Sequence, residues 1–156
     1  MNSLIWAALL SMTPIIEMQG GIPVALAGGY SPWVAFIVCL IANIAVFPVI
    51  YFFLEVVHRR LLHVNHTYQS LFDKFMERTR KKTQKLVDKY GPYGLVVLVA
   101  LPGPGTGVYT ATLAAWFFGM NMWKSFVAIV IGMFFAALII LAASLGIMGG
   151  WHFLTG

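Results

Sequence analysis

Glu17 is the residue whose type and position point most directly to chemistry in this sequence. It is the only charged residue among the first 54 residues, which are largely apolar. A charge at the bilayer centre costs at least about 2.5–3.5 kcal/mol on insertion scales, and acids within a membrane usually mark an ion or substrate path. We therefore interpret Glu17 as a proton- or cation-coupling residue. Three accounts of its state stay open: it is protonated, it accepts bonds from a half-helix N-terminus, or it lines a wet cavity. The structural alternative is a protonated Glu17 that bridges two membrane segments.

The run Pro102-Gly103-Pro104-Gly105-Thr106-Gly107 is a second candidate, because it offers backbone amides and the Thr106 hydroxyl. Half-helix N-termini can hold an anionic group at the central site of a transporter. The run is not a phosphate-binding P-loop, since it lacks the Lys-Ser/Thr pair. A tight loop packed against its symmetry mate is the alternative. The predicted substrate-binding residues are Gln19, Gly20, Gly21, Asn43, Gly103, Gly105, Thr106, Gly107, Tyr109 and Thr110.

The composition predicts an integral membrane protein. The chain is 60% hydrophobic and 10% charged, whereas a soluble domain carries about 25% charged residues. Every Lys and Arg except Lys124 lies within residues 59–89. Basic residues placed between two apolar blocks do not indicate nucleic-acid binding. No Ser-His-acid set, pair of carboxylates or cluster of metal ligands falls within one membrane layer. We therefore expect that the protein is not an enzyme and binds no metal or cofactor.

Each apolar block predicts a broken pair of helical arms followed by one long helix. The arms cover residues 3–12, 22–28, 93–101 and 107–118, and the long helices cover residues 31–57 and 121–147. Proline removes a backbone donor and clashes with the preceding turn, so we place the breaks at Pro14, Pro23, Pro102 and Pro104. Each arm is roughly 10–18 Å long, too short for a hydrocarbon core of about 30 Å. The arms therefore predict re-entrant hairpins, with proline-kinked ordinary helices as the alternative.

The two blocks also resemble each other at an offset of 90 residues. Gly29, Trp33 and Phe36 align with Gly119, Trp123 and Phe126. A re-entrant hairpin plus one spanning helix crosses the membrane an odd number of times, so the second half must run in the opposite sense. The predicted fold is an all-α integral membrane protein with two inverted repeats, each a re-entrant helical hairpin followed by a transmembrane helix. It forms one domain, 1–156, with repeats at about 3–57 and 91–150.

The charged linker, residues 58–90, orients this arrangement. Residues 68–90 predict an amphipathic helix with a basic stripe, which suits an anionic membrane surface, although fixing the topology alone would explain it. The positive-inside rule places the linker in the cytoplasm of a multi-pass cell-membrane protein. The predicted lipid-headgroup residues are Arg59, Arg60, Lys81, Lys85 and Lys124. Small residues in the last helix permit close packing, and with it a homodimer.

The two tips resemble those of a known family. Thr13-Pro14-Ile15-Ile16-Glu17-Met18-Gln19-Gly20-Gly21-Ile22-Pro23 is similar to the first-hairpin motif of the small multidrug export proteins, and the run 102–107 is similar to their second. That family resembles the DedA/VTT-like superfamily, which implies crossed re-entrant hairpins and transport or scrambling of lipids and lipid-linked carriers, often with protons. The resemblance also implies an acid in the first hairpin, which Glu17 supplies, and arginines around the second. No Arg or Lys lies between Tyr90 and Trp123, so a lipid phosphate would depend on backbone amides, Lys124 or the pair Arg59 and Arg60.

The sequence thus predicts a small membrane transporter or exporter that is proton- or cation-linked. It would move an amphiphilic or lipid-linked substrate through a midplane site between two hairpins. An uncoupled lipid scramblase or flippase is one alternative, and a non-transporting scaffold that binds partners through residues 68–90 is another. The expected partners are membrane lipids and the small substrate.

Overall fold

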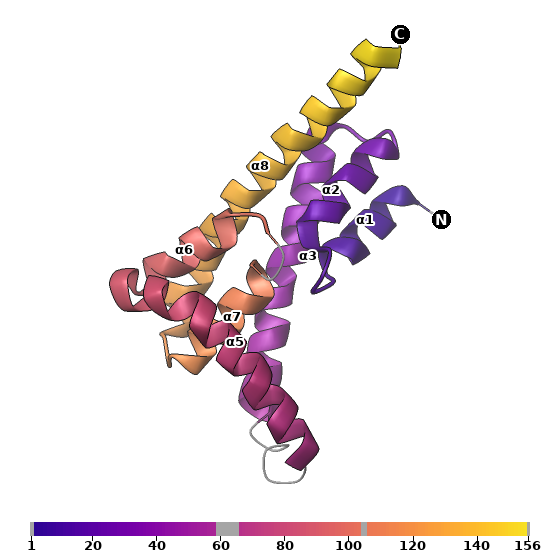
Figure 1. The fold of residues 1–156 in the computed structure, drawn as a ribbon. Helices are drawn as coiled ribbons and strands as arrows, with labels where there is room; N and C mark the ends of the chain where they lie inside the picture. The colour runs from indigo at the N-terminus through magenta and orange to yellow at the C-terminus, as the bar shows by residue number, and fades with distance from the viewer. Residues whose placement is uncertain (1, 59–65, 104–105, 156) are drawn as a thin grey trace.

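The computed structural model describes residues 2–58, 66–103 and 106–155, and these residues are helical apart from short connections (Figure 1). The elements are α1 (Ser3–Ser11), α2 (Glu17–Ala27), α3 (Pro32–Phe52), the π-helix η1 (Phe53–His58), α5 (His66–Tyr90), α6 (Pro92–Ala100), α7 (Val108–Phe117) and α8 (Met122–Thr155). The arms, the long helices and the linker helix thus lie close to where the sequence predicts them. The last helix is longer than predicted.

Two helices in the described part of the chain are long and apolar enough to cross a membrane. They cover Pro32–Val56 and Met122–Ile147. The ring of Phe36 contacts Phe134 with 5.6 Å between centroids, and Phe47 contacts Phe126 at 5.2 Å. Because the numbers rise along α3 while they fall along α8, the two helices pack antiparallel, as Figure 1 also shows.

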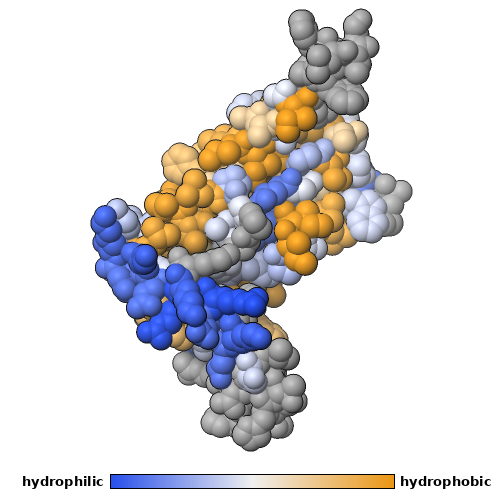
Figure 2. All heavy atoms as spheres, in the orientation of Figure 1, coloured by the Kyte–Doolittle hydropathy of each residue, from blue (hydrophilic) through white to orange (hydrophobic). Residues whose placement is uncertain are grey.

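Large apolar side chains cover the outer faces of these helices. Ile37 and Ile41 on α3, and Val127 and Phe135 on α8, are each at least half exposed. The same apolar surface is visible on the body of the molecule in Figure 2. Soluble proteins rarely expose contiguous apolar patches of more than a few hundred Å². Contact with lipid acyl chains removes this surface from water, which fits a membrane protein.

The first hairpin is closely packed at both of its ends. A side chain on Gly21 would collide with the Ser11 hydroxyl, and one on Gly28 would collide with Ser3. The Tyr30 hydroxyl also donates to the Asn2 side-chain oxygen. The start of α1 therefore lies beside the end of α2, so the chain leaves the hairpin at the end where it entered.

The break in this hairpin is shorter than the sequence predicts. The sequence places Pro23 among the breaks, but α2 begins at Glu17 and continues through Gly20, Gly21 and Pro23. Proline and glycine are tolerated within membrane helices where a neighbouring helix stabilises them. Here α1 packs directly against Gly21, and Ile22 on the same helix is fully buried. Tertiary contact thus outweighs the low helix propensity of these residues.

The second pair of arms is arranged differently. α6 packs mainly along α8, whereas α7 packs against both α3 and α8. α6 and α8 approach closely at Gly132, where a Cβ would lie 2.8 Å from the Val96 carbonyl oxygen and 2.8 Å from the Val99 Cβ. Pro102 and Gly103 are non-helical, as expected, and Pro104 lies outside the described residues.

Backbone hydrogen bonds repeat at the predicted offset of 90 residues. Gly29 N–H donates to Leu26 and Tyr30 N–H donates to Ala25, and the equivalent bonds join Gly119 to Trp116 and Met120 to Ala115. The caps of the following helices repeat as well, because Ser31 Oγ accepts from Val34 N–H and Asn121 Oδ1 accepts from Lys124 N–H. The edge-on ring pair Trp33–Phe36 has its counterpart in Trp123–Phe126. The turn that joins each arm to its long helix is therefore built twice.

The linker helix α5 packs its less polar face on protein. Met76 contacts Leu54 and Leu113, and Thr83 is fully buried. The sequence pattern favours a membrane surface for this face, but α6 and α7 cover it instead. An amphipathic stripe is satisfied equally by lipid and by neighbouring helices, so the pattern alone does not distinguish them. Figure 2 shows the hydrophilic side chains of α5 as a band beside the apolar body.

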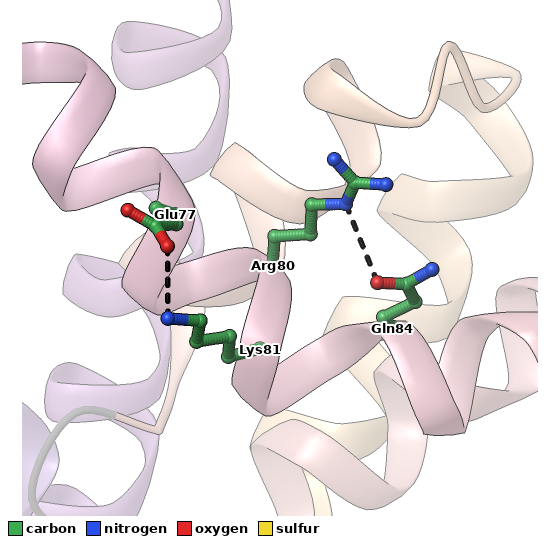
Figure 3. Close-up of polar contacts among 4 residues, drawn as sticks. All are labelled: Glu77, Arg80, Lys81 and Gln84. Atoms are coloured by element: carbon green, nitrogen blue, oxygen red, sulfur yellow. Dashed lines mark hydrogen bonds and ion pairs between the residues drawn. The ribbon is translucent and has the colours of Figure 1, made fainter.

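The exposed face of α5 carries pairs within the helix itself. Lys81 Nζ lies 2.8 Å from Glu77 Oε1, and Arg80 Nε donates to Gln84 Oε1 over 3.3 Å (Figure 3). The hydrogen bond from Lys81, together with its positive charge, lowers the pKa of Glu77. Lys81 therefore already has an acidic partner, whereas Lys85 is exposed without an ion pair to the described residues.

Candidate functional site

The tips of the two broken pairs meet at Glu17 and Gly107. Glu17 is the first residue of α2 and is only 8% exposed. Gly107 is the residue immediately before α7. A Cβ built on Gly107 would collide with both carboxyl oxygens of Glu17. The carboxyl group therefore occupies the space that any larger residue at position 107 would need.

The backbone of Glu17 is strained at this point. Its φ angle is +48°, and it is the only non-glycine residue with positive φ in the described ranges. Left-handed geometry costs a side-chain-bearing residue roughly 1–2 kcal/mol, and such strain tends to cluster at functional sites. The turn from α1 into α2 thus directs the Glu17 side chain inward, and the strained backbone lowers the local stability.

One hydrogen bond joins the two broken pairs, and others close the loop of the second tip. The Tyr109 hydroxyl, on the first turn of α7, donates to the Met12 carbonyl at the end of α1. The Thr106 hydroxyl lies 2.9 Å from the Leu101 carbonyl oxygen and 2.8 Å from that of Gly103. Its proton is thus used within its own loop, which leaves the hydroxyl oxygen as an acceptor. Tyr109 and Thr106 therefore have positioning roles in this arrangement.

A small cavity lies beside the carboxyl group. It has a volume of about 10 Å³ and is bounded by both tips and one face of α8; its lining includes Glu17, Gln19, Thr106, Gly107, Met133 and Ala136. A space of this size holds about one water molecule. The arrangement can accommodate a proton and a water, but a drug-sized substrate needs roughly 300–1,000 Å³. The tips are therefore closed around the acid in this structure.

The electrostatics of the cavity come from one carboxyl group and two helix starts. α2 begins at Glu17 itself and α7 begins next to Gly107, and the N-terminus of a helix carries a partial positive charge. In the described part of the chain, no basic side chain forms an ion pair with Glu17. Helix dipoles contribute less than a full charge, so a proton or a bound cation is needed to neutralise the acid completely.

The structure brings some of the predicted site residues together and separates others. Glu17, Gln19, Thr106 and Gly107 line the same cavity. The other glycines predicted on the first tip face elsewhere, since a side chain on Gly20 would meet Ile16 and one on Gly21 would meet α1. Gly21 thus allows α2 to pack against α1, and Gly20 leaves room for the Ile16 side chain of the preceding turn. Gly103 belongs to the second tip, Thr110 is buried on α7, and Gly105 lies outside the described residues.

Asn43 lies in the interface between the long helices. It is fully buried, and neither its Nδ2 nor its Oδ1 has a hydrogen-bond partner among the described residues. It shares a helix face with Phe36 and Phe47, whose rings contact α8. An unsatisfied buried amide costs roughly 1–3 kcal/mol. Asn43 is not part of the cavity lining, although position 133, its equivalent at the 90-residue offset, is.

Sequence reasoning did not identify the wall that α8 contributes to this cavity. Met133, Ala136 and Ile140 are apolar residues of a long apolar helix, so nothing in their type separates them from the core. The repeat offset would have found the first of them, since it pairs position 43 with position 133. The bond from Trp116 Nε1 to Glu55 Oε2, at 3.0 Å, was also not foreseen.

The predicted headgroup residues are distributed over two regions. Lys81 and Lys85 lie on the exposed face of α5, and Lys124 lies on the first turn of α8 and is exposed. Arg59 and Arg60 lie outside the described residues. None of the described basic residues lines the cavity beside Glu17.

The sequence of the chain matches one known protein family over most of its length. Residues 17–139 match the family described as "Putative small multi-drug export protein". No curated protein and no solved structure matches the chain significantly. The match starts at the acid of the first tip, includes the second tip and extends into α8, so it covers most of the chain. The chain therefore belongs to the small multidrug export protein family.

Proposed function

We propose that the chain is a small multi-pass membrane exporter of amphiphilic or lipid-linked compounds, in which Glu17 binds a proton or a cation. The observation that carries this proposal is the enclosed carboxyl group of Glu17, which lies between the two tips beside a cavity of about one water. An acid without a basic partner in a membrane is stabilised by taking up a proton or a cation. Family membership supports export as the direction of transport.

The proposed topology has two re-entrant hairpins and two spanning helices in inverted repeats. The antiparallel packing of α3 and α8 and the turns that repeat at an offset of 90 residues support this topology. The basic linker would then face the cytoplasm. The relation to the wider DedA-like superfamily remains a prediction from the tip motifs.

Substrate passage then requires the tips to separate. In the closed arrangement the Tyr109–Met12 hydrogen bond and the fit of Glu17 against Gly107 hold them together. Protonation or cation binding at Glu17 changes the charge at this contact. The free energy of separating the tips then differs between the charged and the neutralised state of Glu17. Coupling would follow from this difference.

Glu17→Gln tests the coupling role directly. In proteoliposomes that carry a pH gradient, we expect export of ethidium, an amphiphilic cation, to lose its dependence on the gradient, because the amide cannot exchange a proton. Glu77→Gln, which alters an exposed acid of α5, is the matched control and should transport normally. Full gradient-driven transport by Glu17→Gln would contradict the proposal.

Uncoupled lipid scrambling is the second candidate function. Leu101 lines the cavity beside Glu17 and is also 61% exposed, so the cavity adjoins the surface of the molecule, where a lipid could enter. A scramblase would move a fluorescent phospholipid between leaflets without any gradient, and Glu17→Gln would leave that movement unchanged. A scaffold that acts through α5 would instead lose its function when Lys81, Lys85 and Lys89 are neutralised.

A further inference from the structure

A second and much larger hollow lies between α6 and α8. This groove has a volume of about 520 Å³, and its walls are apolar, formed by Val96 of α6 and by Val127, Ala128 and Ile131 of α8. That volume falls within the range of small-ligand sites. The groove lies at the end of the molecule where α5 joins α6, since α5 ends at Tyr90 and α6 begins at Pro92.

The mouth of the groove combines one cation with two amphipathic rings. Lys124 lines it together with Tyr93 and Trp123, which are 78% and 73% exposed. Tyr and Trp prefer the headgroup level of a bilayer, where their polar atoms stay wet. In the described part of the chain, Lys124 has no acidic partner. An unpaired ammonium at the headgroup level attracts an anion, and the apolar walls below it fit an acyl chain.

The first repeat has the same tryptophan–phenylalanine pair but lacks the charge. Trp33 and Trp123 occupy equivalent positions, and each ring contacts a phenylalanine edge-on, at 6.4 Å and 6.2 Å between centroids. Both tryptophans are also similarly exposed. The residue that corresponds to Lys124 in the first repeat is Val34, so only the second repeat can pair an anionic headgroup with its long helix.

The groove is separate from the cavity that contains Glu17. The two are divided by the seam where Gly132 of α8 packs against Val96 and Val99 of α6, with no room for a Cβ. Lys124 lines only the groove, and Glu17 lines only the cavity. A ligand of the groove is therefore a distinct partner, and its binding does not require transport.

We propose that the groove between α6 and α8 binds one anionic phospholipid of the leaflet that faces the basic linker. The phosphate lies at the Lys124 ammonium, and one acyl chain lies along Val96, Val127 and Ile131. Tyr93 and Trp123 border the headgroup at the interface. The bound lipid covers apolar surface next to the α6–α8 seam.

Quenching of tryptophan fluorescence by brominated lipids tests this site in the intact chain. The protein is reconstituted into phosphatidylcholine vesicles that contain either brominated phosphatidylglycerol or brominated phosphatidylcholine. Each basic residue near an anionic surface strengthens binding by a factor of about five. We therefore expect brominated phosphatidylglycerol to quench with about fivefold higher apparent affinity. This preference should vanish in Trp123→Phe and persist in Trp33→Phe, the matched change in the first repeat.

Substitution of the cation separates a charge-dependent site from general contact with lipid. Lys124→Gln should bring the two brominated lipids to equal affinity, whereas Lys124→Arg and the control Lys74→Gln, at an exposed lysine of α5 outside the groove, should retain the preference. Equal quenching by both lipids in the unaltered protein would overturn the proposal, and so would a preference that survives Lys124→Gln. Absence of Trp123 quenching by either lipid would also overturn it, because a second copy of the chain or another segment would then cover the groove.

Discussion

Glu17 and Gly107 are adapted to each other at the level of single atoms. The carboxyl group of the first residue fills the space beside the α-carbon of the second, and both residues have positive φ angles. Glycine adopts such angles readily, whereas glutamate does so at a cost of roughly 1–2 kcal/mol. The backbone strain thus lies on Glu17, and Gly107, which has no side chain, leaves room for the Glu17 carboxyl group.

The fit predicts that Gly107→Ala destabilises the protein more than the same change at Gly119. Both glycines have positive φ, at 125° and 61°, but a Cβ on Gly119 has nothing within 4 Å. Gly119→Ala should therefore cost only the backbone term, roughly 1–2 kcal/mol, and should keep transport. Gly107→Ala also displaces the Glu17 carboxyl group, so it should lower the melting temperature further and abolish transport. Equal melting temperatures for the two variants would contradict the close contact.

α7 is the element that connects the central site to the rest of the molecule. At its N-terminal end Tyr109 bonds to Met12 of the first tip, and at its C-terminal end Trp116 bonds to Glu55 in η1. Leu113, between them, packs in the cluster that joins η1 to α5. π-helical turns are often found at functional sites. A movement of α7 would therefore be transmitted both to the tips and to the linker helix.

The link between α7 and η1 can be measured by a double-mutant cycle. Trp116→Phe and Glu55→Gln each weaken or remove the 3.0 Å bond between the indole N–H and the carboxyl oxygen. A hydrogen bond to a charged group contributes about 1.5–3 kcal/mol. We expect a coupling energy of at least about 1 kcal/mol in the free energy of unfolding in detergent, because the pair is only partly buried. Additive effects of the two substitutions would show that the bond does not join these elements energetically.

At the scale of the whole molecule, charge and exposed apolar surface are separated in space. The basic residues of α5 form a band at one end, and the outer faces of α3 and α8 are apolar (Figure 2). The start of α1 and the end of α2 lie together at another end. A bilayer that covers the apolar faces would leave the α5 band in water on one side.

This arrangement predicts which positions are accessible from each side of the membrane. In a Cys39→Ala background, which removes the one native and buried thiol, single cysteines would replace Asn2, Ser31, Lys85 and Asn121. We expect an impermeant maleimide added outside intact cells to label positions 2 and 31, and to label 85 and 121 only after lysis. Labelling of position 2 from the same side as position 85 would refute the inverted topology.

The amphipathic stripe of α5 and the Gly-Pro runs show what a sequence pattern leaves undetermined, namely which neighbour a residue packs against. The hydrophobic period of residues 68–90 correctly predicts the helix α5, because burial against any apolar partner selects the same residues. It does not identify that partner, and so the face of α5 that suits a membrane surface contacts α6 and α7 instead. Likewise, Gly21 and Pro23 look like a break, but contact with α1 keeps them helical.

The sequence by itself determined the apolar blocks, the offset of 90 residues, the two tips and the choice of Glu17 as the candidate acid, since each depends on local residue types and their spacing. Only the tertiary structure decided that Glu17 meets Gly107, that Met133 and Ala136 complete the cavity, and that Lys124 borders a separate groove. These contacts join residues far apart in the chain. They depend on how closely the helices approach, and that distance is set by the packing of both partners together.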